Sequence, residues 1–256
     1  MNNESRSIEL EVEVQGTPEE VWRAIATGPG ISSWYVPHVV EERTDGAAVA
    51  RFGPGPEMEV DGRVAAWDPP RRIVFDGGEG VEGLAFEWIV EARDESTCIV
   101  RLVNSGFGGG GEWDDHFDAM TDGWKIFMSN LQLHLLHFGG QSATASLPTA
   151  MWPGSCEAAW TELKQTVGVP EGVRSGDHIE VGTIGTPSMS GTVVEATATR
   201  VSLLVDSPAP GTAFIAAEGM GDQAQVSVWA YLYGDDAERI VERDQPAWQS
   251  VLDRTS

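Results

Sequence analysis

The sequence predicts an α+β fold in which an antiparallel sheet curves around one long helix, followed by a second and smaller α+β unit. Three observations predict it: a long apolar stripe at residues 112–138, a run of short strand-like segments before it, and a partial echo of the same pattern after it. The large apolar residues of the stripe recur every three or four positions, so they fall on one face of a helix. A helix face this rich in aromatic residues needs a broad apolar surface, and a concave sheet provides one.

The chain begins with one strand and one capped helix. An apolar residue stands at every second position of residues 8–14, alternating with glutamates, which is typical of a half-buried strand. Thr17 is followed by Pro18 and, three residues on, by Glu20, and this spacing predicts a helix start with a capping box. The sequence Gly-Pro-Gly at 28–30 predicts the end of that helix, and a second short helix is expected at 31–35.

Six further strands are predicted before the long helix. Turns rich in Gly, Pro and Asp separate them, and their regular spacing predicts an antiparallel meander. The predicted strands are 39–43, 47–52, 58–67, 72–76, 84–92 and 97–103. Gly106 to Gly111 form a lead-in to the helix, whose first turns carry aspartates that the helix dipole favours. Gly139 and Gly140 predict its end.

Four stretches of the first 140 residues carry a resemblance to a known family. They are TPEEVWRAI at 17–25 with Trp34 and Tyr35 after it, GRV at 62–64 leading to DPPRRIVF at 68–75, VRLVNSGF at 100–107, and GWK at 123–125 opening the spacing Phe127, Leu131, Leu135. In this order they resemble the START/Bet v1-like (SRPBCC) superfamily, most of all its activator of Hsp90 ATPase homologue 1-like (AHSA1) branch. The resemblance implies a helix-grip domain over residues 1–140, with an internal cavity between the curved sheet and the long C-terminal helix.

Residues 141–256 repeat parts of the first pattern. Trp160 in EAAW echoes Trp22 in EEVW, and GTV at 191–193 stands nine residues before Arg200, as GRV at 62–64 stands nine residues before Arg71. Residues 141–154 resemble a linker, with a strand in part of it as the alternative. Strands are predicted at 201–206, 212–218 and 225–233, then a last helix capped by Asp235, which Pro246 should bend or split. These echoes predict a second, shortened copy of the same domain at 141–256, with chance similarity as the alternative.

Composition limits the function classes. The chain has 40 acidic and 16 basic residues, a net charge of -24, which repels nucleic-acid phosphates and anionic lipid, so neither nucleic-acid nor membrane partners are expected. Residues 1–13 show no signal-peptide pattern and no apolar run approaches about 18 residues, so a cytoplasmic protein without a membrane span is expected. The two cysteines, Cys98 and Cys156, form no metal-binding spacing, and no metal or organic cofactor is predicted.

The sequence contains none of the motifs of the common catalytic classes, so no catalytic residue is predicted. His134 and His137 lie three apart on the long helix, but no acidic residue completes a metal site, and solvated side chains are the favoured interpretation. His116 follows two aspartates near the helix start. It is interpreted as a rim residue paired with an aspartate, and a general base is the alternative.

The aromatic residues are the most informative candidates for a site. If strand parity holds, they and their neighbours point into the space between sheet and helix, which suits an apolar or aromatic small molecule. A filled core is the alternative, and for Trp34, Tyr35 and His38 packing under a loop is equally open. The expected ligand-binding residues are Trp34, Tyr35, His38, Phe52, Met58, Trp67, Phe75, Trp88, Trp113, His116, Phe117, Met120 and Trp124, and Phe86 belongs to the same aromatic set.

Three functions follow from the resemblance. The first is a protein that binds a hydrophobic small molecule in the cavity. The second is a cyclase- or hydrolase-like enzyme acting on a hydrophobic substrate, for which His38, His116 and Asp114 or Asp115 would have to converge. The third is an Hsp90-activator-like interaction with a chaperone partner, which rests on likeness of fold alone.

Overall fold

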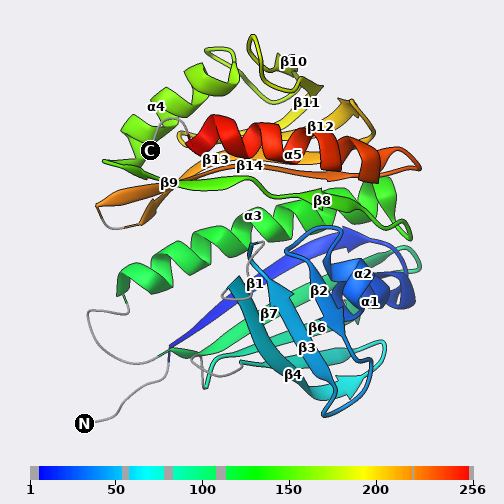
Figure 1. Cartoon of the computed structure of the whole chain (residues 1–256). Helices are drawn as coiled ribbons and strands as arrows, with labels where there is room; N and C mark the ends of the chain where they lie inside the picture. Colours follow the sequence, from blue (N-terminus) through cyan, green and yellow to red (C-terminus); the bar gives the residue numbers. More distant parts are fainter. Residues whose placement is uncertain (1–5, 54–57, 78–82, 108–113, 221, 254–256) are drawn as a thin grey trace. The chain divides into compact units, whose positions relative to one another are not determined.

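The computed structural model describes residues 6–53, 58–77, 83–107, 114–220 and 222–253, without the side chains of 6, 107, 114–119, 122 and 220. The chain divides into two compact units, Met1–Ser142 and Ala143–Ser256, called here the first and the second unit (Figure 1). Within the described residues, no helix has both the length and the apolar composition needed to span a bilayer.

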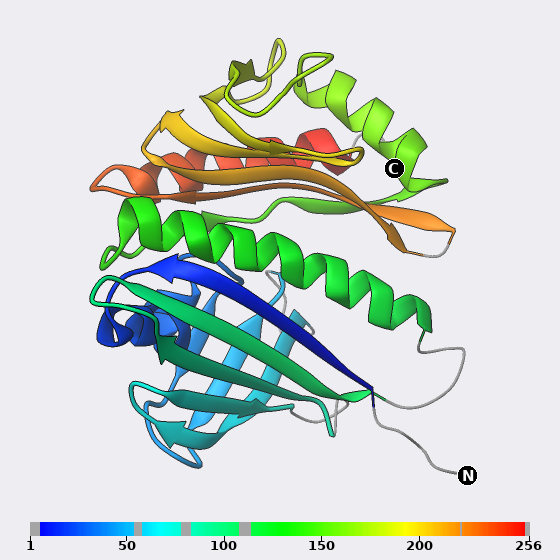
Figure 2. The same cartoon turned by 180° about the vertical axis from the view of Figure 1, so that it is seen from behind.

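The first unit is a seven-stranded antiparallel sheet with one long helix (Figures 1 and 2). Its elements are β1 (Arg6–Gln15), α1 (Pro18–Ala26), α2 (Gly28–Ile31), β2 (His38–Val40), β3 (Ala47–Arg51), β4 (Glu59–Asp68), β5 (Arg72–Asp76), β6 (Ala85–Ala92), β7 (Thr97–Phe107) and α3 (Asp114–Phe138). The strand order is β1-β7-β6-β5-β4-β3-β2, so the first strand pairs with the last and the rest form a meander. The predicted helix-grip arrangement, a curved antiparallel sheet with a long C-terminal helix, is confirmed.

The start of α1 follows the predicted capping box. Thr17 Oγ1 accepts a hydrogen bond from the backbone N of Glu20 at 3.3 Å, and Glu20 Oε2 accepts one from the backbone N of Thr17 at 2.8 Å. The predicted second helix at 31–35 is wrong in its position, because α2 begins at Gly28. Thr27 Oγ1 accepts a hydrogen bond from Gly30 N at 3.1 Å and a proline stands in the first turn, so the Gly-Pro-Gly sequence opens a new helix as well as ending α1.

Among the six strands predicted between the first helices and α3, boundaries differ from the prediction by more than one residue at two places. β2 ends at Val40, where 43 was predicted, because the chain turns there: Arg43 N donates to Glu41 O at 2.7 Å and Asp45 has a φ of 59°. β7 runs four residues beyond the predicted end, through Phe107, and pairs with β1 along this extension.

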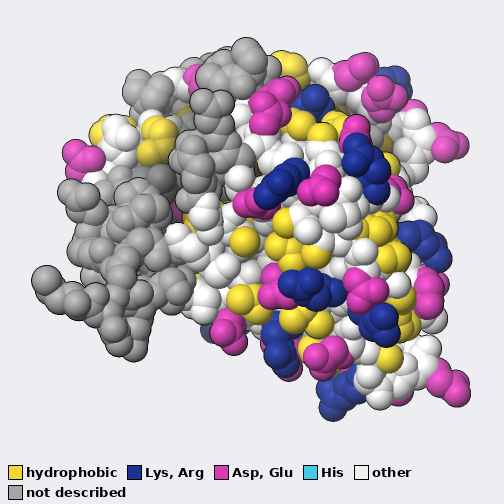
Figure 3. Space-filling model, turned by 90° about the horizontal axis from the view of Figure 1, so that it is seen from below, with side chains coloured by type: hydrophobic (Ala, Val, Ile, Leu, Met, Phe, Trp, Pro, Cys, Tyr) yellow, Lys and Arg dark blue, Asp and Glu magenta, His cyan; other side chains and the backbone are white. Residues whose placement is uncertain are grey.

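Alternation divides the sheet of the first unit into a core-facing and an outer surface. The core-facing positions of β1, β6 and β7 are buried or half-buried and mostly aliphatic or aromatic, and they pack against α1 and α3. Basic and acidic side chains on the outer surface pair across strands: Arg51 with Glu59, Arg63 with Asp76, Arg72 with Glu87 and Arg101 with Glu11. Figure 3 shows a face on which charges of both signs are interspersed in this way.

The second unit has the same strand topology with one strand fewer in its meander. It comprises β8 (Thr144–Ser146), β9 (Thr149–Pro153), α4 (Cys156–Val167), β10 (His178–Val181), β11 (Met189–Ala196), β12 (Arg200–Ser207), β13 (Gly211–Met220), β14 (Gln223–Leu232) and α5 (Ala237–Asp253). The sheet order is β10-β11-β12-β13-β14-β8, and β9 also pairs with β14. The opening strand, divided here into β8 and β9, again pairs with the last strand, β14. As in the first unit, one helix (α4) follows the opening strand and another (α5) follows the last strand.

Local details of the two units correspond. Trp22 and Trp160 are each the fifth residue of the helix after the opening strand, and both are buried. A bulge follows Val64 on β4, and another follows Val193 on β11, each two residues after the glycine of the echoed sequence. The interpretation as a second copy of the fold is thereby supported over chance similarity.

Two local expectations for the second unit need correction. Residues 141–154 were interpreted mainly as a linker, but β8 and β9 occupy most of them, because both pair with β14. Pro246 does not split the last helix, since α5 runs from Ala237 to Asp253 as one element.

Candidate ligand-binding site

Tyr35 lies at the centre of a cluster of aromatic rings in the first unit. It follows α2, and its ring centroid lies 4.5 Å from that of Phe127 and 5.0 Å from that of Trp124, both on α3. Its ring also contacts those of Trp34, His38 and Phe52, at 5.9, 5.5 and 6.2 Å. The segment after α2, the sheet and the long helix therefore meet at this side chain.

Trp124 connects the cluster to the middle of the sheet. Its ring centroid lies 5.7 Å from that of Phe86 and 5.5 Å from that of Trp88, both on β6. Trp88 is in turn 5.5 Å from Trp34, whose Nε1 donates to Ala24 O at 2.9 Å. This hydrogen bond satisfies the one polar group of a fully buried indole and fixes the chain just before Tyr35.

His38 adds a polar atom to the aromatic cluster. Its Nδ1 lies 2.7 Å from Val36 O, and because a carbonyl oxygen only accepts, Nδ1 carries the proton. Burial lowers the pKa of His38 to about 4, so the ring is neutral near pH 7. Nε2 then holds a lone pair, to which no described residue donates a hydrogen bond. The ring faces Phe75, with centroids 6.5 Å apart.

The hydroxyl of Tyr35 stays protonated as well, because burial raises the pKa of Tyr35 above its ordinary value. Tyr35 and His38 thus offer a neutral hydroxyl and a neutral imidazole, side by side, in an apolar setting.

Several rings of this cluster remain partly accessible although they belong to the core-facing side of the unit. Tyr35, Phe75, Phe86 and Phe127 are half-buried, whereas other core-facing residues of the same sheet, among them Ile73, are fully buried. These four rings therefore converge on one another and still keep part of their apolar surface exposed.

The structure brings together seven of the predicted site residues and places others elsewhere. The connected rings are Trp34, Tyr35, His38, Phe52, Phe75, Trp88 and Trp124, together with Phe86. Trp67 packs at 5.0 Å on Trp22 of α1, outside this network, and Met58 is 42% exposed. Met120 is partly buried against the core of the first unit.

Some predictions fall on parts that the structure does not describe. Trp113 lies outside the described residues, as do the side chains of Asp114, Asp115, His116 and Phe117, so the proposed convergence of polar groups there stays a prediction.

The prediction of two solvated histidines is wrong for His134 and right for His137. His134 is 2% exposed, and burial lowers its pKa to about 4, whereas His137 is exposed. The predicted stripe covered too little of α3, since Ile126 and Leu133 are buried too. Among the described residues, no group of three His, Cys, Asp or Glu side chains is arranged to hold a metal.

Two residues of the site region were missed. Phe127 was placed on the helix stripe but not in the site, although it contacts both Tyr35 and Trp124. Asn104 is fully buried on the core-facing side of β7, in line with Leu102. Strand parity places Asn104 on that side, but it was not among the predicted site residues.

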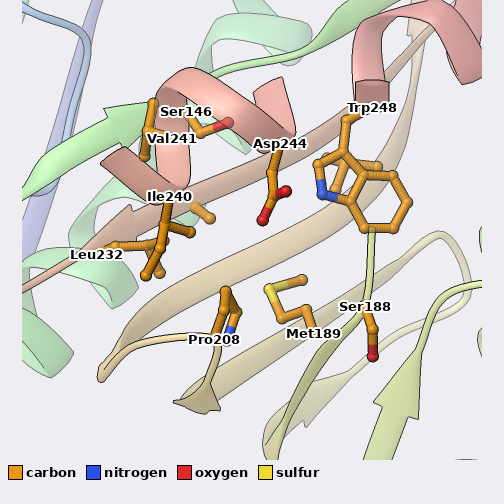
Figure 4. Close-up of a pocket in the computed structure, with 11 residues that line it drawn as sticks. Ser146, Ser188, Met189, Pro208, Leu232, Ile240, Val241, Asp244 and Trp248 are labelled. Atoms are coloured by element: carbon orange, nitrogen blue, oxygen red, sulfur yellow. The ribbon is translucent and has the colours of Figure 1, made fainter. Parts of the chain in front are cut away.

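The second unit does not repeat the aromatic cluster. Aligned at their bulges, the two sheets have equivalent core-facing positions. Phe75, Phe86 and Trp88 of the first unit correspond to Leu203, Ala213 and Ile215 of the second unit, in that order. Between α5 and this sheet lies a cavity of about 20 Å³, into which Asp244 points between Ile240 and Trp248 (Figure 4). That is room for about one water molecule.

One further hollow lies on the first unit, away from the rings. It has a volume of about 320 Å³ and lies where the turn after β1 meets the end of α3, lined by Gln15, Gly16, Glu20, Leu135, Leu136, His137 and Gly139.

Comparison with known proteins gives one family match. Residues 5–132 match the model of the family described as polyketide cyclase / dehydrase and lipid transport. No curated protein matches the chain.

Solved structures show similarity at low identity. The Aha1 dimer from Colwellia psychrerythraea is 18% identical, covers 51% of this chain and 96% of its own, and has a TM-score of 0.43. The di-domain ARO/CYC protein BexL is 15% identical over 98% of both chains, with a TM-score of 0.46. DynU16, from the dynemicin biosynthetic locus, is 16% identical over 96% of this chain and 95% of its own, with a TM-score of 0.45.

Proposed function

The chain belongs to the polyketide cyclase / dehydrase and lipid transport family, and we propose that its first unit binds an apolar or aromatic small molecule against the rings around Tyr35. Family membership confirms the predicted resemblance to the START/Bet v1-like superfamily. What we propose is the kind of molecule that the first unit of this family member binds, and where it binds.

One observation carries the proposal: half-buried rings converge around polar atoms that no described residue satisfies. Packing alone favours full burial of rings such as Phe75 and Phe86, and it favours partners for Tyr35 Oη and His38 Nε2. An aromatic guest would bury the rings further, by stacking, and would hydrogen-bond to the polar atoms.

The electrostatics of His38 favour binding over catalysis. An efficient general base has a pKa near the working pH, and the pKa of His38 is lowered to about 4, so its Nε2 accepts a hydrogen bond well but removes a proton weakly. A cyclase-like reaction is the second candidate, since a ring of the aromatic cluster carries an unprotonated Nε2. It requires a guest whose acidic C–H or O–H lies against this atom. The Hsp90-activator-like role has no specific observation among the described residues in its favour.

We further propose a single binding site per chain, in the first unit. Its rings at Phe75, Phe86 and Trp88 are replaced in the second unit by Leu203, Ala213 and Ile215, and the cavity beside α5 has about 20 Å³. A ligand of several rings requires a pocket of roughly 300 Å³ or more.

Two variants test the proposal. Native mass spectrometry and a titration with a dihydroxyanthraquinone, followed by quenching of tryptophan fluorescence, are expected to detect one bound molecule in the wild-type protein. Tyr35→Leu removes the ring on which the cluster centres and should weaken binding at least tenfold. Met151→Ala removes an apolar side chain that is 39% exposed in the second unit, and should bind as the wild type does. Equal binding by both variants would refute the assignment of the site.

A further inference from the structure

Asn104, fully buried on the core-facing side of β7, has an amide that the described residues of the first unit satisfy only in part. Its Nδ2 donates to Ala85 O at 3.1 Å, and this carbonyl partner fixes the orientation of the amide. Oδ1 is inaccessible to solvent and accepts no hydrogen bond from any residue that the structure describes. A buried acceptor without a partner costs free energy in the unliganded protein, and a donor from a guest would recover it.

Inward of Ile8 on the edge strand β1, a row of core-facing side chains begins with Asn104. It pairs across strands with Phe86, and Phe86 pairs with Phe75. The ring of Phe75 faces that of His38, at 6.5 Å. Neighbouring core-facing side chains lie about 5 Å apart across a sheet, so Oδ1 of Asn104 and Nε2 of His38 are on the order of 15 Å apart along this row.

Both ends of the row therefore present a hydrogen-bond acceptor. Nε2 of His38 accepts because Nδ1 holds the proton, and Oδ1 of Asn104 is a carbonyl oxygen. The rings between them, Phe75 and Phe86, are half-buried and apolar.

Charge is missing from the core-facing positions of the described strands. From β1 to β7 these positions hold aliphatic, aromatic, glycine, cysteine, histidine and asparagine residues, and the arginines and glutamates point to the outer surface. A buried carboxylate or phosphate without a cationic partner is strongly disfavoured.

From these observations we infer that the ligand is an uncharged, elongated aromatic molecule with a hydrogen-bond donor at each end, one donating to His38 and the other to Asn104. The inference deepens the proposed function and rests on it. It assigns Asn104 as a binding residue and selects diphenol-like ligands over fatty acids and phospholipids.

Three probes test this on the intact wild-type protein: a dihydroxyanthraquinone with its hydroxyls at opposite ends, the dimethyl ether of the same molecule, and palmitate. The diol is expected to bind about tenfold more tightly than the dimethyl ether, since the net gain of one to two hydrogen bonds corresponds to a factor of this order. Palmitate is expected to bind more weakly than either.

Two variants test whether the preference for the diol over the ether depends on Asn104. In Asn104→Leu the advantage of the diol over the ether should shrink severalfold, while Ser105→Ala, a change at the next residue on the opposite side of β7, should leave it unchanged. Because the probe series uses the wild-type protein, it remains decisive if Asn104→Leu fails to fold. If diol and ether bind equally, or if palmitate binds best, the inference is overturned and the proposed function survives. If no probe binds, both are refuted.

Discussion

Acidification is expected to destabilise the protein through His38 in a pH window set by its pKa. The imidazole has an ordinary pKa of 6.5 and a pKa of about 4 in the folded state. As the pH falls below 6.5, the unfolded chain takes up the proton first, so folding stability is lost between pH 6.5 and pH 4 and the loss levels off below pH 4. Each pKa unit corresponds to about 1.4 kcal/mol, and because the ring is partly accessible we expect a total loss of about 2 to 3 kcal/mol.

The comparison that isolates this effect uses His38→Asn. The asparagine amide can replace Nδ1 as the donor to Val36 O but does not titrate. Urea denaturation of both proteins at about pH 7.5 and about pH 4 gives four free energies of unfolding, and the wild type should lose about 2 to 3 kcal/mol more than the variant on acidification. The contributions of His134 and of the carboxylates are common to both proteins and cancel. Equal losses would refute the assignment of a neutral, buried His38.

Further predictions concern local structure and stoichiometry. Gly30→Ala should destabilise the first unit by about 3 kcal/mol or more in thermal or urea unfolding, since its Cβ would lie 1.9 Å from Arg23 O. Gly123→Ala, where no described atom outside the helix's own backbone lies within 4 Å of the added Cβ, should stabilise α3 by about 0.5 to 1 kcal/mol, and a loss there would contradict the open environment. Thr17→Ala should cost about 1 kcal/mol through the lost cap, and an unchanged midpoint would count against the capping box. Isothermal titration with the dihydroxyanthraquinone should give one site per chain, and two equivalent sites would disprove the distinction between the units.

Helical spacing and strand parity predicted the parts of the site that depend on regular geometry. The stripe on α3 placed Trp124 on the sheet-facing side, and alternation placed Phe75 and Trp88 opposite it. Because of the bulge after Val64, Trp67 faces the core like its partner Ile73, but it packs there on Trp22 of α1 and not on the rings around Tyr35. A bulge of one residue leaves no clear mark in a single sequence.

The protonation of His38 and the burial of His134 could not be predicted from the sequence, for a different reason. Which nitrogen of His38 carries the proton depends on Val36 O, a backbone atom that only the folded turn brings within 2.7 Å. The burial of His134 likewise depends on how much of α3 is covered, not on its apolar stripe alone. Strand parity alone places Asn104 on the core-facing side of β7. It was not predicted as a site residue because its asparagine side chain is not aromatic or apolar.

The central claim is that the first unit holds a guest between its sheet and α3, against Tyr35 and Trp124. A crystal structure of the protein with a bound dihydroxyanthraquinone tests it most directly. We expect one molecule stacked on these rings, with one hydroxyl within about 3 Å of His38 Nε2. A molecule bound elsewhere, with the space beside Tyr35 closed by the protein's own side chains, would contradict it.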